Sequence, residues 1–172
     1  MRWKARPWFV PLSVILVLFL FRSSIYRSVM SYQAFKEIPV QTLESEACVL
    51  STDIEDLMSN SLSFVSDDLH FVWTSANTKV NKMQNGSDAN CIGYSAYFAA
   101  HLRKCLEENN IEQQFIIKHQ RAHIFLWSWN VHSLINHSFF ADHDMVEVTV
   151  KASGQQWIID PSLYDYLWIK SY

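Results

Sequence analysis

Residues 88–108 read DANCIGYSAYFAAHLRKCLEE, and this stretch decides the fold. Asn90 is a favourable N-cap residue, so we expect a helix whose first residue is Cys91. The unpaired N–H groups and the positive end of the helix dipole favour a thiolate at that position. Small and apolar residues recur at spacings of three and four, which predicts a helix buried against a sheet: Ser95, Phe98, Ala99, Leu102, Cys105 and Leu106. Taken alone, Cys91 is equally compatible with a nucleophile and with a buried structural cysteine.

The chain beyond this helix is rich in residues that favour strands. Residues 113–119 and 123–129 are predicted as two strands, and residues 130–142 as a polar loop that carries histidines. Residues 143–160 then predict a β-hairpin that turns near Ser153 and Gly154.

His143 opens the first strand of this hairpin and Asp160 ends the second. Both residues therefore lie at its open end, and any connection of even length places them on the same face. A strict Ser-Gly turn would leave them four residues out of register, or about 13 Å apart. Contact between the two side chains therefore requires a bulge or an offset turn.

A cysteine at a helix start, then a histidine, then an aspartate is the order of a thiol catalytic triad. In such a triad the imidazole takes the thiol proton, and the carboxylate orients the imidazole. The candidate catalytic residues are thus Cys91, His143 and Asp160, and the expected chemistry is acyl transfer.

Three segments resemble the transglutaminase-like superfamily: GSDANCIGYS at 86–95, HDMVEV at 143–148 and WIIDPS at 157–162. The resemblance covers residues 64–167. It implies a papain-like α+β fold in which the cysteine helix packs on an antiparallel sheet. It also implies that Cys91 is the nucleophile, His143 the base and Asp160 the orienting acid.

The function expected from this resemblance is that of a thiol enzyme that acts on an amide bond of a protein or peptide, by hydrolysis or transfer. The alternative is a binding or scaffold module that keeps the fold without the activity. A related thiol fold, such as an arylamine acetyltransferase or a cell-wall peptidase, shares the order of cysteine and histidine but would need a different core.

Upstream of the cysteine, Thr52-Asp-Ile-Glu55 forms a capping box that predicts the start of a helix. Residues 69–73 predict a short strand, and residues 74–87 a polar loop. We therefore place the transglutaminase-like domain at residues 52–172 and treat residues 31–51 as a linker.

Residues 1–30 begin with a basic end and continue into an apolar run from Trp8 to Phe21. The run is short, but residues 22–26 can extend it, and no small-residue cleavage site follows. We therefore predict an uncleaved transmembrane helix rather than a signal peptide. The basic amino end predicts a single-pass membrane protein with its domain on the non-cytoplasmic side.

The non-cytoplasmic side is commonly oxidising, and three cysteines allow one disulfide and one free thiol. A Cys48–Cys105 pair with a free Cys91 is one of three arrangements, and three reduced thiols are equally compatible with the sequence. A metal site drawing on His132, His137 and Asp142 matches no zinc spacing, and we interpret these residues as part of a solvent-facing loop.

The composition argues against two further classes of function. The formal net charge is -3, and the globular part carries no basic stripe, so no nucleic-acid partner is expected. The chain has only 3 glycines, which cannot form a phosphate loop or a dinucleotide fingerprint. No cofactor is therefore expected.

Overall fold

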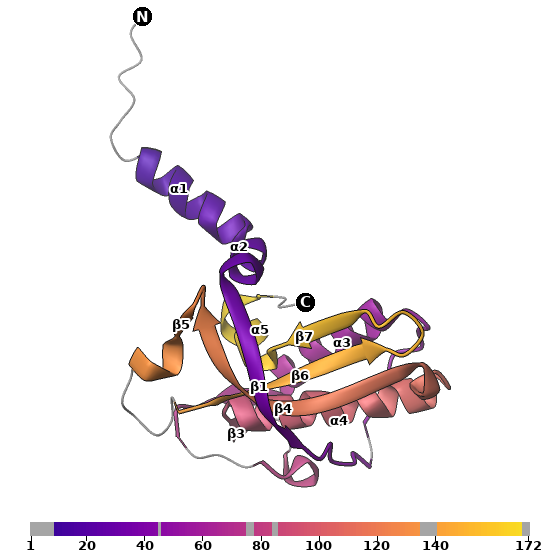
Figure 1. Cartoon of the computed structure of the whole chain (residues 1–172). Helices are drawn as coiled ribbons and strands as arrows, with labels where there is room; N and C mark the ends of the chain where they lie inside the picture. The colour runs from indigo at the N-terminus through magenta and orange to yellow at the C-terminus, as the bar shows by residue number, and fades with distance from the viewer. Residues whose placement is uncertain (1–8, 45, 75–77, 84–85, 135–140, 170–172) are drawn as a thin grey trace, which may run out of the picture.

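A computed structural model describes residues 9–44, 46–74, 78–83, 86–134 and 141–169. The chain forms an α+β fold with one main antiparallel sheet (Figure 1). Its helices are α1 (Phe9–Leu20), α2 (Arg22–Val29), α3 (Ile54–Asp68), α4 (Cys91–Glu108) and α5 (Pro161–Leu167), with 3-10 turns η1 (Val80–Lys82), η2 (Glu112–Gln114) and η3 (Val131–Leu134). Its strands are β1 (Met30–Ile38), β2 (Leu69–Phe71), β3 (Ser87–Ala89), β4 (Phe115–Leu126), β5 (Trp129–Asn130), β6 (His143–Val150) and β7 (Gln156–Ile159).

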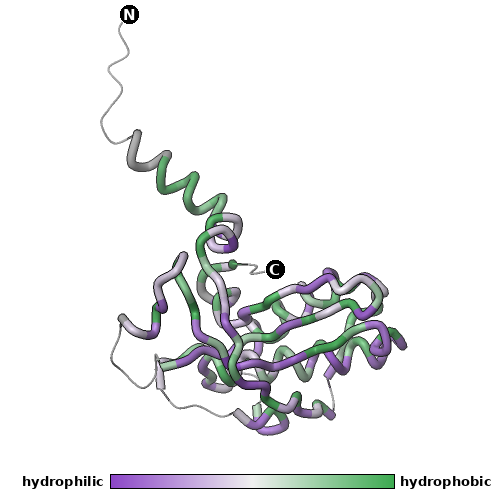
Figure 2. Tube along the Cα trace, in the orientation of Figure 1, coloured by the Kyte–Doolittle hydropathy of each residue, from purple (hydrophilic) through white to green (hydrophobic). Residues whose placement is uncertain are grey.

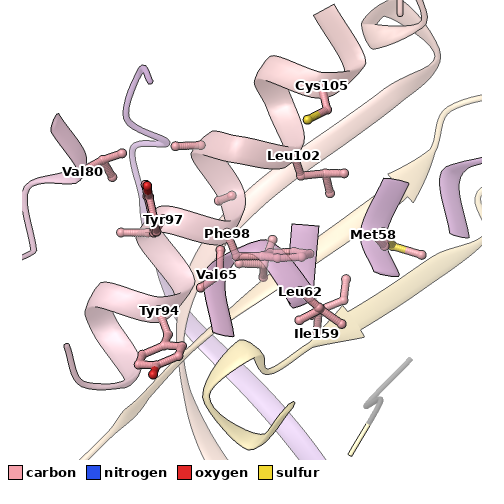
Figure 3. Close-up of a cluster of buried hydrophobic side chains, with 14 of the residues drawn as sticks. Met58, Leu62, Val65, Val80, Tyr94, Tyr97, Phe98, Leu102, Cys105 and Ile159 are labelled. Carbon is pink, nitrogen blue, oxygen red and sulfur yellow. The ribbon is translucent and has the colours of Figure 1, made fainter. Parts of the chain in front are cut away.

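Helix α4 is the centre of the core, and it begins at Cys91 as the sequence predicts. The Asn90 side chain caps it by accepting hydrogen bonds from the N–H groups of Ile92 and Gly93. The helix is buried around most of its circumference, beyond the predicted stripe, because α3 covers the side that the sheet leaves open. Figure 3 shows Tyr97, Phe98 and Leu102 of α4 among side chains of α3 and β7. Each such buried apolar side chain contributes about 1.5–3 kcal/mol to folding.

The main sheet has the order β1-β4-β6-β7, and β5 pairs with β4. The two strands predicted within residues 113–129 are in fact one long strand, β4. Residues 120–122 continue the ladder because β4 pairs with β1 on one side and β6 on the other. This pairing supplies hydrogen-bond partners to polar residues that break the apolar pattern of the sequence.

The predicted hairpin is present as β6 and β7, and its turn is offset from a strict Ser-Gly turn. The N–H of Val150 donates to the carbonyl oxygen of Gln155, so four residues, 151–154, connect the strands. Gly154 has a φ of +72°, a left-handed conformation that glycine adopts without strain. The longer connection halves the offset between His143 and Asp160 to two residues, or about 7 Å along the strands.

Residues that we assigned to the membrane segment and the linker form the edge strand β1 instead. Strand β1 pairs with β4 from Met30 opposite Leu126 to Ile38 opposite His119. The linker assignment missed the strand because β1 is mostly exposed and its residues therefore lack an apolar alternation. The sheet that carries His143 thus extends upstream of residue 52.

The predicted transmembrane helix is wrong, and with it the single-pass membrane location. Within the described ranges, no helix combines the length and the apolar character that crossing a bilayer requires. Figure 2 shows an apolar α1, but α1 has only 12 residues, or about 18 Å, against about 30 Å of hydrocarbon. The polar helix α2 follows it, and Arg22 donates hydrogen bonds to the carbonyl oxygens of Leu167 and Trp168 rather than extending the apolar run.

A disulfide joins Cys48 to Cys105, and Cys91 is the free cysteine. Of the arrangements that the sequence left open, the structure has this one. The disulfide fastens the segment between β1 and α3 to the C-terminal half of α4. Cys91 lies at the opposite end of the same helix.

Candidate active site

Cys91 is the first residue of α4, between the cap residue Asn90 and Ser95, which contacts β6. Cys91 is 7% exposed to solvent, so its thiol is nearly enclosed. One turn along the helix, the buried Ser95 hydroxyl donates to the carbonyl oxygen of Asp144 at 2.9 Å. This bond ties the first turn of α4 to the start of β6, next to His143. The helix start and the strand start are therefore held together.

His143 and Asp160 meet at the open end of the β6–β7 hairpin, where the sequence places them. The Nε2 atom of His143 lies 2.6 Å from Oδ2 of Asp160. The Asp160 carboxylate is 1% exposed, so the pair is shielded from solvent. The offset turn brings the two residues within reach, and the length of the imidazole ring spans the remaining distance.

Cys91 interacts with His143, because a hydrogen bond from its side chain and its charge both act to raise the pKa of the imidazole. Because Nε2 of the imidazole is engaged by Asp160, the nitrogen that remains for the thiol is Nδ1. Cys91, His143 and Asp160 thus interact in the order of a thiol triad. This arrangement allows a proton to move from the thiol to an imidazole that the carboxylate orients.

The electrostatics of the pair favour a charged imidazole. Burial disfavours the charged form of His143, but the Asp160 carboxylate and hydrogen bonds to Asp160 and Cys91 raise its pKa well above 6.5. Burial likewise acts to raise the pKa of Asp160, yet the charge of His143 and hydrogen bonds from neighbouring side chains lower it below 3.8. The ion pair is therefore the favoured state of these two residues.

Two further side chains contact Asp160, and neither was predicted from the sequence to belong to the site. Ser162 donates its hydroxyl to Oδ1 at 2.7 Å, and Tyr32 donates to Oδ2 at 3.1 Å. Ser162 stands two residues after the aspartate, where hydroxyl side chains commonly bond to a carboxylate, so the sequence contained a local signal. Tyr32 is 128 residues away and carried no such signal.

A cavity of about 350 Å³ adjoins Tyr32. It lies between the amino-terminal segment and β7, and its lining includes Tyr26, Arg27, Tyr32 and Trp157. Tyr32 thus faces this cavity and also bonds to Asp160. The cavity is large enough for an amino-acid side chain.

A second buried histidine–aspartate pair lies on the neighbouring strands. His119 Nε2 is 2.8 Å from Asp144 Oδ2, and Arg121 Nε is 3.2 Å from the other oxygen of the same carboxylate. Asp144 adjoins His143 in the chain, but successive residues of a strand point to opposite faces, so this network lies on the other face of β6. It joins β4 to β6.

Two sets of residues carry side-chain atoms of the kinds that bind metal ions. His132 and Asp142 lie in described residues, where His132 packs near His123 and Asp142 pairs with Arg121 at 3.5 Å; His137 lies outside them. Among the described residues, the ligand atoms of Cys48, His101 and Cys105 lie within 4.8 Å of one another. The disulfide uses both of these sulfur atoms, and Nδ1 of His101 lies 3.0 Å from the Ser61 hydroxyl, so this group offers no thiolate to a metal.

Comparisons of this chain with models of protein families, with curated proteins and with solved structures found no match.

Proposed function

We propose that this protein is a thiol enzyme of the transglutaminase-like type, which acts on an amide bond of a protein or peptide through Cys91, His143 and Asp160. The observation that carries the proposal is the 2.6 Å contact between His143 and Asp160, and Cys91 is among the groups that raise the pKa of the same imidazole. A histidine and an aspartate that served only the core would not need a free cysteine at a helix start as their third member.

In the proposed reaction, the proton of the Cys91 thiol has passed to Nδ1 of His143, which gives the charged imidazole that Asp160 favours, and the sulfur of Cys91 attacks the amide carbonyl carbon. Asp160 stabilises the imidazolium that forms. The imidazolium then gives its proton to the amine as the C–N bond breaks. The acyl group stays on the sulfur of Cys91. Attack by water completes hydrolysis, and attack by a second amine completes transfer.

The start of α4 offers a donor for the oxyanion of the tetrahedral intermediate. The N–H groups of Ile92 and Gly93 bond to the Asn90 side chain, and that of Tyr94 bonds to the Asn90 carbonyl oxygen. The N–H of Cys91 itself is thus the helix-start donor that remains for the substrate. In acyl-transfer enzymes, removing one such donor lowers the rate by about 100- to 1,000-fold.

The experiment is the pH dependence of Cys91 alkylation by iodoacetamide in the full chain with its disulfide intact. The expected result is rapid alkylation at about pH 6, because the pKa of His143 is raised well above 6.5 and the charged imidazole supports the attacking sulfur. His143→Ala should return the profile to that of an ordinary thiol, and His70→Ala, an exposed histidine on β2, should leave it unchanged.

A scaffold module without activity predicts a different result. In that case Cys91 reacts as slowly as an ordinary buried thiol, and His143→Ala changes nothing. Trapping then extends the test: a peptide carrying a thiol-reactive amide analogue should label the wild-type chain at Cys91 and should not label Cys91→Ser.

A further inference from the structure

We propose that Tyr32 is a positioning residue of this site, and that it holds the Asp160 carboxylate in the orientation that supports His143. This inference deepens the proposed function and rests on it. The residue comes from β1, upstream of the domain boundary that the sequence suggested.

The Asp160 carboxylate is held at both of its oxygens. Oδ2 accepts a hydrogen bond from Tyr32 at 3.1 Å and contacts His143 at 2.6 Å. Oδ1 accepts from Ser162 at 2.7 Å. The carboxylate cannot turn about its side-chain bond without breaking at least one of these contacts. Tyr32 and Ser162 therefore determine which lone pair of Asp160 faces the imidazole.

The register of the sheet explains how a tyrosine from the amino-terminal segment reaches Asp160. Ala34 pairs with Ala122 in β4, and Ala122 pairs with His143 in β6. Cross-strand partners share a face, and so do residues two apart on one strand, so Tyr32 lies on the face of His143. The ring centres of Tyr32 and His143 are 6.5 Å apart. The hydroxyl of Tyr26 in α2 bonds to that of Tyr32 and holds the phenol from the other side.

The hydroxyl of Tyr32 remains a donor at every pH at which the protein is folded. Burial, followed by the charge of Asp160 and the proximity of Tyr26, raises the pKa of Tyr32 well above 10.0. Cys91 from α4 interacts with His143, Tyr32 from β1 interacts with Asp160, and Tyr26 from α2 acts on Tyr32. Tyr32 donates directly to the carboxylate, and such donors favour its ionised form.

Without the Tyr32 hydroxyl, Oδ2 of Asp160 would keep His143 as a partner but lose a donor, and one of the hydrogen bonds that lower the pKa of Asp160 would be gone. Both changes remove support from the imidazolium of His143. Cys91 would then react more slowly at a given pH.

The test is Tyr32→Phe in the full chain with its disulfide intact, measured as the rate constant for iodoacetamide alkylation of Cys91 against pH. Removing one hydrogen bond to a charged group shifts the profile by up to about one pH unit. We therefore expect the pH at which the alkylation rate is half-maximal to rise by that amount. The rate at about pH 6 should fall up to about tenfold.

Tyr97→Phe is the matched control. Tyr97 also donates to a carboxylate, Asp68 Oδ2 at 2.8 Å, but this bond joins α4 to α3 and does not touch the pair. This variant should lose similar stability and keep the wild-type profile. Tyr26→Phe, which leaves the Tyr32 hydroxyl in place, should shift the profile in the same direction by less, and it carries the test if Tyr32→Phe does not fold.

The failures of the two proposals are distinguishable. A wild-type profile with rapid alkylation at low pH, unchanged in both Tyr32→Phe and Tyr26→Phe, overturns the role of Tyr32 and leaves the triad standing. A wild-type profile of an ordinary thiol overturns the proposed function and this inference together.

Discussion

At the scale of single residues, the Asp160 carboxylate links side chains from three other parts of the candidate site. It accepts hydrogen bonds from Tyr32 and Ser162, and it contacts His143 across a distance typical of a charge-assisted bond. Its negative charge is what overcomes the cost of burying a charged imidazole. Replacing the Asp160 carboxylate by a neutral amide therefore tests the role of its charge directly.

Asp160→Asn should lower the rate of Cys91 alkylation at about pH 6 by about tenfold or more, because losing the charged partner of the imidazolium costs about 1.5–3 kcal/mol. The amide is nearly the same size, so the fold should persist, as circular dichroism would check. Asp165→Asn is the control, since Asp165 bonds to Tyr94 and Ser66 and not to His143. Equal rates in the two variants would show that Asp160 does not support the imidazole.

At the scale of elements, the start of α4 is a cap and a site at once. The Asn90 side chain satisfies two N–H groups of the first turn, which also sets the position of Cys91. Asn90→Ala should lower the free energy of unfolding by about 1 kcal/mol, with a range of about 0.5–2 kcal/mol. Urea denaturation measures this loss.

The same substitution should also slow Cys91 alkylation at low pH, because a frayed first turn moves the thiol away from His143. Asn90→Ser keeps a capping oxygen and should recover most of both losses. Recovery of stability without recovery of the alkylation rate would mean that the cap does not position Cys91.

The middle of α4 carries a histidine that should make the fold sensitive to acid. His101 stacks on Phe64 at a ring-centre distance of 4.1 Å and bonds to Ser61, and burial lowers its pKa from 6.5 to about 4. Because its folded pKa lies below its unfolded one, its contribution is complete above about pH 6.5. It is lost as the pH falls toward about 4, and the whole effect amounts to about 3 kcal/mol.

Urea denaturation at a series of pH values measures this loss. His101→Gln should be less stable near neutral pH and should show a shallower decline between about pH 6.5 and 4. His70→Gln, at an exposed position, should keep the wild-type slope. Parallel declines in wild type and His101→Gln would contradict the assignment.

At the scale of the whole molecule, the Cys48–Cys105 disulfide joins residues 57 apart. Closing a loop of that length removes about 4 kcal/mol of entropy from the unfolded chain. The double variant Cys48→Ala and Cys105→Ala should lose up to about this much unfolding free energy. Cys91→Ala, which breaks no disulfide, is the control. If both variants lose the same stability, the disulfide does not stabilise the fold.

The sequence by itself determined the parts of this protein that depend on neighbouring residues. The N-cap at Asn90 and the helix from Cys91 follow from local hydrogen bonding. The helix near residue 54 was also predicted from a local cap, but its N-cap is Asp53, which accepts from the N–H of Glu55, and not Thr52 of the predicted capping box. The alternation of a strand placed His143 and Asp160 on one face, since that period is the same in every sheet.

Only the tertiary structure decided what depends on distant pairing. The offset turn set the register that brings His143 to Asp160, and the pairing of β1 with β4 added Tyr32 across 128 residues. The choice of Cys105 as the partner of Cys48 required the segment after β1 to fold back onto α4. The bonds of Arg22 to the carbonyl oxygens of Leu167 and Trp168 likewise join segments far apart in the chain. Such contacts leave no local pattern, because neither partner shows in its own neighbourhood what it will meet.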